Sequence, residues 1–283
     1  MSPTWEDPPE YRGSGSAMHF AMPSLTPVVK RLLILHFGIF FFFYFWWLAS
    51  EGTYLHVSRA LSVGPELWKA WFPFVPFWQL LTYGFLHSTT DPFHILFNLM
   101  FLYFLGTMLE DVVGSRRFLV VYLASMLAGG VLTLLMKFVL GHSAPTVGAS
   151  GAIFGVVVAA AVLRPQARII FIIVPMTLKV FALIYVGVNV FLALNVVAKS
   201  FSYASDYFAH LGGALYAFLA ARRGWIWRDP IAILEARQAV VRENRKVDDQ
   251  KRVDELLERI HQQGMQSLSE RDRAFLRRVS KRQ

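Results

Sequence analysis

Ser143 to Gly155 reads Ser-Ala-Pro-Thr-Val-Gly-Ala-Ser-Gly-Ala-Ile-Phe-Gly and leads into an apolar run. This run predicts a helix that begins near Gly151, directly after Ser150. A serine at this position lies at a helix N-terminus, where free backbone N–H groups stabilise negative charge. The stretch therefore suggests Ser150 as a nucleophile.

A histidine enters another apolar run sixty residues later, in Ala209-His210-Leu211-Gly212-Gly213. A serine hydroxyl is a weak nucleophile until a base accepts its proton, so Ser150 needs His210 within hydrogen-bond reach. Small residues four apart allow two membrane helices to approach closely. Here these residues are Gly151 and Gly155 after the serine, and Gly213 and Ala217 after the histidine.

The composition is that of a membrane protein. Of the 283 residues 55% are hydrophobic, with 25 Phe and 8 Trp, and the mean hydropathy is +0.44. The formal net charge is +9, but the basic residues flank the apolar runs instead of forming one patch, which argues against nucleic-acid binding. The chain has no cysteine, so disulfides and thiolate metal sites are excluded.

The apolar runs predict an all-α, polytopic membrane protein with six spans. The fourth span is short, so its start must lie below the membrane surface or the bilayer must be thin around it. Residues 50–91 are rich in Trp and interrupted by Pro73 and Pro76, which favours a first loop in the membrane interface over a seventh span. The expected spans are 32–49, 93–109, 118–140, 151–163, 180–197 and 207–221.

Basic residues predict how the chain crosses the membrane. The segments that flank the spans on one side of the membrane carry more basic residues than those on the other side. Because the basic side is usually cytoplasmic, this bias places both termini in the cytoplasm. Ser150 and His210 then lie at the same depth, towards the extracytoplasmic side. The basic side carries Lys30, Arg31, Arg116, Arg117, Arg164, Arg168, Lys179, Arg222 and Arg223, and the other side carries Arg59, Lys69, Lys137 and Lys199.

Composition divides the chain into three parts. Residues 1–29 are rich in Pro, Gly and Ser and are expected to form a disordered cytoplasmic lead-in, while residues 30–222 hold the six spans. Residues 223–283 are charged and basic, and they predict a cytoplasmic helical tail. Gly264 is expected to end the first helix of this tail. The expected apolar face of that helix consists of Leu256, Leu257 and Ile260.

Four polar residues are expected at the extracytoplasmic ends of the spans, namely His94, Asn98, Ser150 and His210. Polar groups at membrane depth are costly and mark candidate functional sites. His94 and Asn98 are four residues apart on one helix face, so their side chains can join the Ser150 N–H in stabilising an oxyanion. No acid is clearly placed to orient His210, which favours a Ser–His dyad over a triad. Asn189, Asn195 and Asp206 are interpreted as structural.

These motifs resemble those of the rhomboid intramembrane serine proteases, over about residues 30–222. The resemblance rests on His94-Ile95-Leu96-Phe97-Asn98, Gly148-Ala149-Ser150-Gly151 and Ala209-His210-Leu211-Gly212-Gly213, in this order. It implies that Ser150 is the nucleophile and His210 the general base. It also implies that His94 and Asn98 supply side chains to the oxyanion hole.

Further positions follow from the same resemblance. Phe154 matches an aromatic residue that packs against the catalytic histidine, and residues 50–91 resemble the family's interfacial first loop. Trp78-Gln79 stands where many members have Trp-Arg, a departure that concerns the anchoring of the loop. His87 resembles an additional family histidine.

The resemblance implies hydrolysis of peptide bonds in or near transmembrane segments, in a bacterial cell (inner) membrane and without a cofactor or metal ion. The partners are then transmembrane protein substrates and the lipid bilayer. A catalytically inactive relative that binds client membrane proteins is the alternative, but it has no need of both Ser150 and His210. A transporter or channel would spread its polar residues through the bilayer depth, whereas here they cluster at one end.

Overall fold

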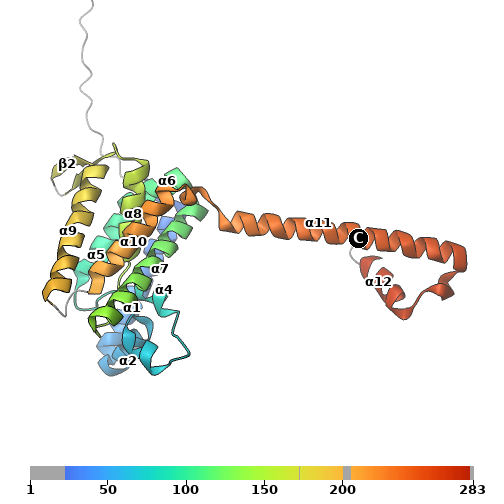
Figure 1. Ribbon diagram of the computed structural model, residues 1–283, viewed down its shortest axis with the longest axis horizontal. Coiled ribbons are helices and arrows are strands. Elements are labelled where there is room, and N and C mark those ends of the chain that lie inside the picture. The colour runs from blue at the N-terminus through green and yellow to red at the C-terminus, as the bar shows by residue number, and fades with distance from the viewer. Residues whose placement is uncertain (1–22, 172, 200–204, 281–283) are drawn as a thin grey trace, which may run out of the picture.

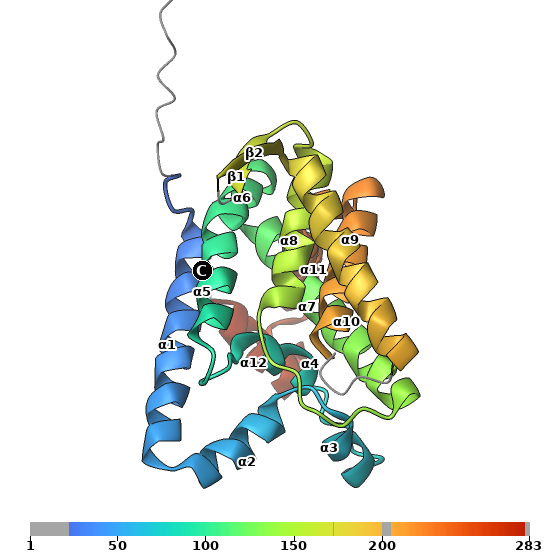
Figure 2. The ribbon, with the colours of Figure 1, turned by 90° about the vertical axis from the view of Figure 1, so that its left-hand side faces the viewer.

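A computed structural model describes residues 23–171, 173–199 and 205–280. The chain forms a bundle of helices from which one long helix extends (Figure 1). In the bundle, α8 lies between α5, α7, α9 and α10 (Figure 2). The bundle consists of α1 (Pro27–Ala49), α5 (Pro92–Phe101), α6 (Thr107–Val113), α7 (Ser115–Leu140), α8 (Ser150–Leu163), α9 (Leu178–Lys199) and α10 (Ser205–Arg222), with a π-helical stretch (Leu102–Gly106) that joins α5 to α6.

The all-α polytopic fold expected from the sequence is confirmed. Among the described residues, four helical segments are long and apolar enough to cross a membrane, namely α1, the run from Pro92 to Val113, α7 and α9. Helices α8 and α10 have 14 and 18 residues, and the count of six crossings stays a prediction. Since α1 begins at Pro27, residues 27–29 belong to a helix and not to the expected lead-in, of which residues 1–22 lie outside the described part.

Helix α8 is buried over most of its length. Every residue from Gly151 to Ala161 is buried, as expected for a helix that is apolar on all sides. At 1.5 Å per residue its 14 residues span about 21 Å, less than the roughly 30 Å of a hydrocarbon core. This length agrees with a helix whose first residue lies below the membrane surface.

Small residues let α8 approach its neighbours backbone to backbone. A Cβ on Gly213 of α10 would collide with the carbonyl oxygen of Gly151 of α8. A Cβ on Gly155 would collide with the side chain of Ser125 of α7. Ala217, one turn beyond Gly213, is completely buried. The contact of Gly213 with Gly151 sets the distance between α10 and α8, and that of Gly155 with Ser125 sets the distance between α8 and α7.

Residues 50–91 form short helices at one end of the bundle (Figure 2). Gln79 is buried, and its Nε2 donates to the carbonyl oxygens of Arg59 at 3.2 Å and Ala60 at 3.3 Å. The indole N–H of Trp78 also donates to the Ala60 carbonyl oxygen, at 2.9 Å. An amide side chain therefore anchors this loop at position 79. The helices are α2 (Glu51–Leu61), α3 (Pro65–Ala70), α4 (Gln79–Thr82) and the 3-10 turn η1 (Tyr83–Phe85).

A short antiparallel hairpin connects α8 to α9, where the sequence predicts no strand. Strand β1 (Arg168–Phe171) pairs with β2 (Val174–Thr177), with Arg168 opposite Thr177. Each strand has four residues, too few for a period-two pattern to stand out from an irregular loop.

The tail contains a long helix and a short one that packs against its far end (Figure 1). Gly264, with φ of 79°, ends the long helix as expected. Leu256 and Phe275 are buried where the two helices meet, but Leu257 is 53% exposed, because adjacent residues on a helix point in different directions. The elements are η3 (Trp225–Trp227), α11 (Pro230–Gln263), η4 (Met265–Ser267) and α12 (Glu270–Ser280).

One buried carboxylate fixes the start of two bundle helices. Glu110 of α6 accepts hydrogen bonds from Thr26 Oγ1 at 2.5 Å and from the backbone N–H groups of Val28 and Val29 at 3.0 and 2.8 Å. It also accepts one from Ser115 Oγ, in the first turn of α7, at 2.6 Å. Because the first N–H groups of a helix have no intrahelical acceptor, Glu110 supplies one for α1.

We expect Glu110→Ala to lower the free energy of unfolding by about 3 kcal/mol, because it leaves buried donors without an acceptor. Thermal unfolding in detergent, followed by tryptophan fluorescence, measures the change. Asp111→Ala removes the adjacent, exposed acid and is the matched control. Equal midpoints for the two variants would contradict the role given to Glu110.

We expect Gly213→Ala to lower the free energy of unfolding by about 3 kcal/mol, because the added Cβ meets backbone atoms that can move only with the whole helix. Gly187→Ala in α9 is the control, because a Cβ there meets no atom within 4 Å. The same unfolding measurement should show loss of stability only for Gly213→Ala.

Candidate active site

Ser150 and His210 meet across the interface of α8 and α10. Ser150 is the first residue of α8, and its Oγ lies 2.7 Å from Nε2 of His210. Both residues stand within one turn of the glycines at which the two helix backbones touch, Gly151 and Gly213. The geometry allows the imidazole to accept the hydroxyl proton.

The loop before Ser150 requires glycine at position 148. The φ angle of Gly148 is 129°, a conformation that residues with a side chain rarely adopt. A Cβ at this position would lie 2.5 Å from Nε2 of His94 and 3.6 Å from Oγ of Ser150. Gly148 therefore lets the His94 ring approach the serine.

Asn189 of α9 contacts the opposite side of the His210 ring. Its Oδ1 lies 2.7 Å from Nδ1 of His210, and its Nδ2 donates to the carbonyl oxygen of Tyr185 at 3.2 Å. The second bond assigns the amide oxygen to the ring, so Nδ1 of His210 carries the hydrogen and Nε2 is free to accept one from Ser150. An amide thus occupies the position that the acid has in a soluble triad.

From sequence alone Asn189 is expected to be structural, like Asn195 and Asp206. Asn195 agrees with that reading, because its Nδ2 donates to the carbonyl oxygen of Phe191 in its own helix, at 2.7 Å. The side chain of Asp206 lies outside the described part of the structure. Sequence alone could not single out Asn189, because both asparagines occur on the same apolar span.

Two aromatic rings support the imidazole. Phe154 stacks on His210 with 4.2 Å between ring centroids and an interplanar angle of 8°. On its other face Phe154 stacks on Tyr185, at 4.0 Å and 12°. Phe154 was expected beside the histidine, whereas Tyr185 was not singled out. The stack holds the plane of the ring while Asn189 fixes its rotation.

His94 and Asn98 line the same cavity as Ser150 and His210, with a volume of about 450 Å³. Asn98 is buried, and its Nδ2 donates to the carbonyl oxygen of His94 at 2.8 Å. An amide nitrogen carries two hydrogens, so a second remains for a group bound in the cavity. Two side-chain donors can thus face an oxygen bound beside Ser150.

His87 contacts His94 but does not line the cavity that holds Ser150. Its ring centroid is 5.4 Å from that of His94 and 5.4 Å from that of His36. His87 is buried, and neither of its ring nitrogens has a hydrogen-bond partner among the described residues. The described residues contain no group of three or more His, Asp or Glu side chains that could hold a metal ion.

Comparison with known proteins places these residues in a family. A family model described as the rhomboid domain matches residues 76–225, more than half of the chain. A second model, described as a family of unknown function, matches residues 242–282. The first match contains Ser150, His210, His94, Asn98 and Asn189.

Curated relatives agree with this match. Rhomboid-like protease 3 of Toxoplasma gondii is 33% identical over 49% of this chain and 48% of its own length. The rhomboid protease GluP of Bacillus subtilis (strain 168) is 31% identical over 51% of this chain and 25% of its own length. Rhomboid protein 1, mitochondrial, of Saccharomyces cerevisiae is 30% identical over 50% of this chain and 40% of its own length. The chain thus spans half or less of the length of these relatives.

We expect Asn189→Ala to slow covalent modification of Ser150 by a fluorophosphonate, on the order of tenfold to a hundredfold, because His210 loses the contact that orients it. Gel-based labelling of the purified protein over time measures the rate. Asn195→Ala removes an amide from the same helix and should label like the wild type. Wild-type labelling of Asn189→Ala would show that the base does not need this amide.

Proposed function

The chain belongs to the rhomboid family, and on this premise we propose that it is an intramembrane serine endopeptidase. It would cleave peptide bonds in or near transmembrane segments of other membrane proteins. The observation that carries the proposal is the 2.7 Å contact between Ser150 Oγ and His210 Nε2 inside an apolar bundle. Relatives named as proteases support it.

The first step is attack of Ser150 on the scissile carbonyl carbon. As the Oγ–C bond forms, Nε2 of His210 takes the hydroxyl proton, and Asn189 Oδ1 accepts a hydrogen bond from the Nδ1–H of the resulting imidazolium. No carboxylate is needed, because the amide already selects the reactive tautomer. The proposal is therefore a Ser–His dyad that is oriented by an amide.

The second requirement is stabilisation of the oxyanion that forms on the carbonyl oxygen. We assign this to His94, Asn98 and the backbone N–H of Ser150 at the start of α8. His210 then returns its proton to the leaving amine, which breaks the C–N bond and leaves an ester on Ser150. A water molecule that His210 deprotonates hydrolyses this ester.

The substrate must unwind before it reacts. A transmembrane helix satisfies its own carbonyl groups with hydrogen bonds, so a peptide bond becomes accessible only where the helix is locally unstable. The 450 Å³ cavity is polar around Ser150 and His94, which suits an extended segment and the hydrolytic water. A preference for small residues at the cut is part of the proposal.

The protein is a multi-pass membrane protein, and we propose the inner membrane of a bacterium as its location, with both termini in the cytoplasm. The relative from Bacillus subtilis supports a bacterial membrane. Arg116 at the start of α7, Lys179 at the start of α9 and Arg222 at the end of α10 lie at the bundle end opposite α2 and α3 (Figure 2). The positive-inside bias puts that end in the cytoplasm.

An inactive client-binding protein is the competing function. It would require the cavity but not the contact between Ser150 and His210, nor the amide and aromatic stack that orient the histidine. These features together favour the enzyme.

We expect the purified protein to cleave a reporter with a helix-destabilised transmembrane segment, and Ser150→Ala and His210→Ala to lose at least a thousandfold in rate. Cleavage in liposomes is followed by gel electrophoresis, with circular dichroism as the test of folding. Cleavage by folded Ser150→Ala at the wild-type rate would refute the mechanism. Absence of both cleavage and fluorophosphonate labelling in the wild type would favour the client-binding protein.

A further inference from the structure

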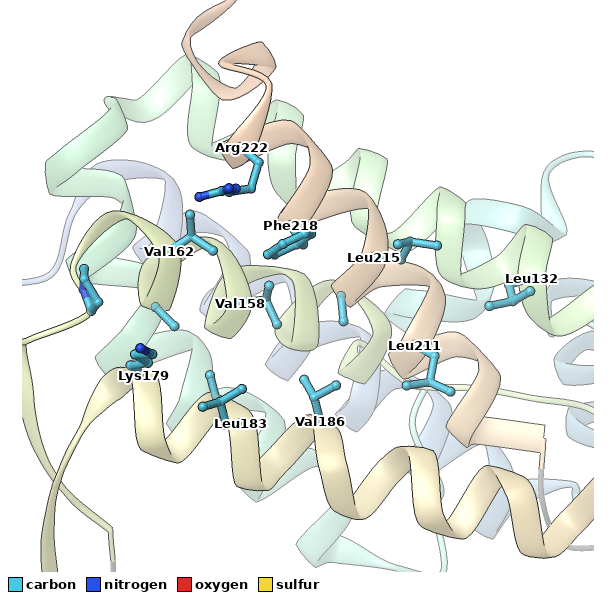
Figure 3. Close-up of a pocket in the computed structure, with 14 residues that line it drawn as sticks. Leu132, Val158, Val162, Lys179, Leu183, Val186, Leu211, Leu215, Phe218 and Arg222 are labelled. Atoms are coloured by element: carbon cyan, nitrogen blue, oxygen red, sulfur yellow. The ribbon is translucent and has the colours of Figure 1, made fainter.

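A second cavity lies on the other side of α9 and α10, away from Ser150. Its volume is about 620 Å³, and it is lined by side chains of α7, α8, α9 and α10 (Figure 3). Tyr185 and His210 line the site cavity, whereas Val186 and Leu211 line this one, so different residues of α9 and α10 face the two cavities. None of the residues proposed for catalysis lines the second cavity.

The wall of the second cavity is apolar and faces outward. Leu183 of α9 is 64% exposed, Leu215 of α10 57% and Phe218 45%, although each lies on a helix of the bundle. Buried Val158 and Ala214 form its floor. In a multi-pass membrane protein such a groove faces lipid tails and not water.

Two cations lie at one end of this groove. Lys179 stands at the start of α9 and Arg222 at the end of α10, while Leu132 and Leu211 lie at the opposite end (Figure 3). Within residues 23–171, 173–199 and 205–280, neither the Lys179 nor the Arg222 side chain forms an ion pair or a hydrogen bond. The pair is therefore available to an anion at the membrane surface.

The length of the groove corresponds to one leaflet. Leu211 and Arg222 are eleven residues apart on α10, which is about 16 Å at 1.5 Å per residue. Half of a hydrocarbon core of about 30 Å is about 15 Å. The groove thus extends from the level of the headgroups to the level where acyl chains end.

We propose that this groove binds an acidic phospholipid, with one acyl chain along α8 and α10 and its phosphate between Lys179 and Arg222. The two cations at one end of the groove match a single anionic headgroup. A single acyl chain fits this space. The proposal rests on the membrane location and not on the proposed hydrolysis.

Binding of lipids of matched acyl chains to the purified wild type tests the proposal. Native mass spectrometry in a mild detergent would compare phosphatidylglycerol, which is acidic, with phosphatidylcholine, which is zwitterionic. We expect Lys179→Gln/Arg222→Gln to weaken phosphatidylglycerol binding about 30-fold, at about 1 kcal/mol for each lost cation. Phosphatidylcholine binding should stay unchanged.

A matched control separates the groove from general attraction to a basic surface. Arg168→Gln/Arg223→Gln removes the same charge from the same end of the bundle, but neither residue lines the groove. This double variant should bind phosphatidylglycerol like the wild type. Ala214→Leu, which fills the floor and keeps both cations, should lose the bound lipid. Equal binding of the two lipids, or equal loss in the two double variants, would overturn the proposal. None of these measurements uses peptide cleavage. Failure of the lipid-binding proposal can therefore be told apart from failure of the proposed function.

Discussion

The backbone contact between Gly151 and Gly213 is the constraint on which the candidate site depends. A Cβ on Gly213 would overlap the carbonyl oxygen of Gly151, so any larger residue forces α8 and α10 apart. Ser150 precedes one glycine and His210 precedes the other by less than a turn, so the helix separation is also the separation of the two reactive groups. The 2.7 Å contact follows from packing and not from flexible side chains that happen to meet.

Two networks of buried polar groups join helices of this bundle. A polar group without a partner in an apolar interior costs several kcal/mol, which favours positions where another helix supplies a partner. Glu110 gathers the donors at the starts of α1 and α7, and Asn189 joins α9 to α10 through His210. The first network fixes the cytoplasmic end proposed for the bundle, and the second fixes the reactive end.

Much of this fold and of the candidate site could be predicted from the sequence. Long apolar runs and the glycine spacing reveal the helices and their close approach, and His94, Asn98, Ser150 and His210 do line one cavity. The partner of Nδ1 of His210 could not be predicted, because Asn189 and Asn195 lie on the same apolar span, and the one that faces His210 is decided by the rotation and the height at which α9 packs. That rotation depends on packing with helices that are distant in sequence. The β-hairpin was missed because its strands are too short to show a pattern.

Two of the groups that orient His210, the Asn189 amide and the Tyr185 ring that backs Phe154, come from α9 alone. Tyr185 also forms part of the cavity wall. Any movement of α9 away from α10 breaks both contacts together, so the histidine loses its orientation while α9 is displaced. Full reactivity then returns only when α9 packs against its neighbours again. The reactivity of Ser150 is thereby coupled to the position of a helix that carries neither the nucleophile nor the base.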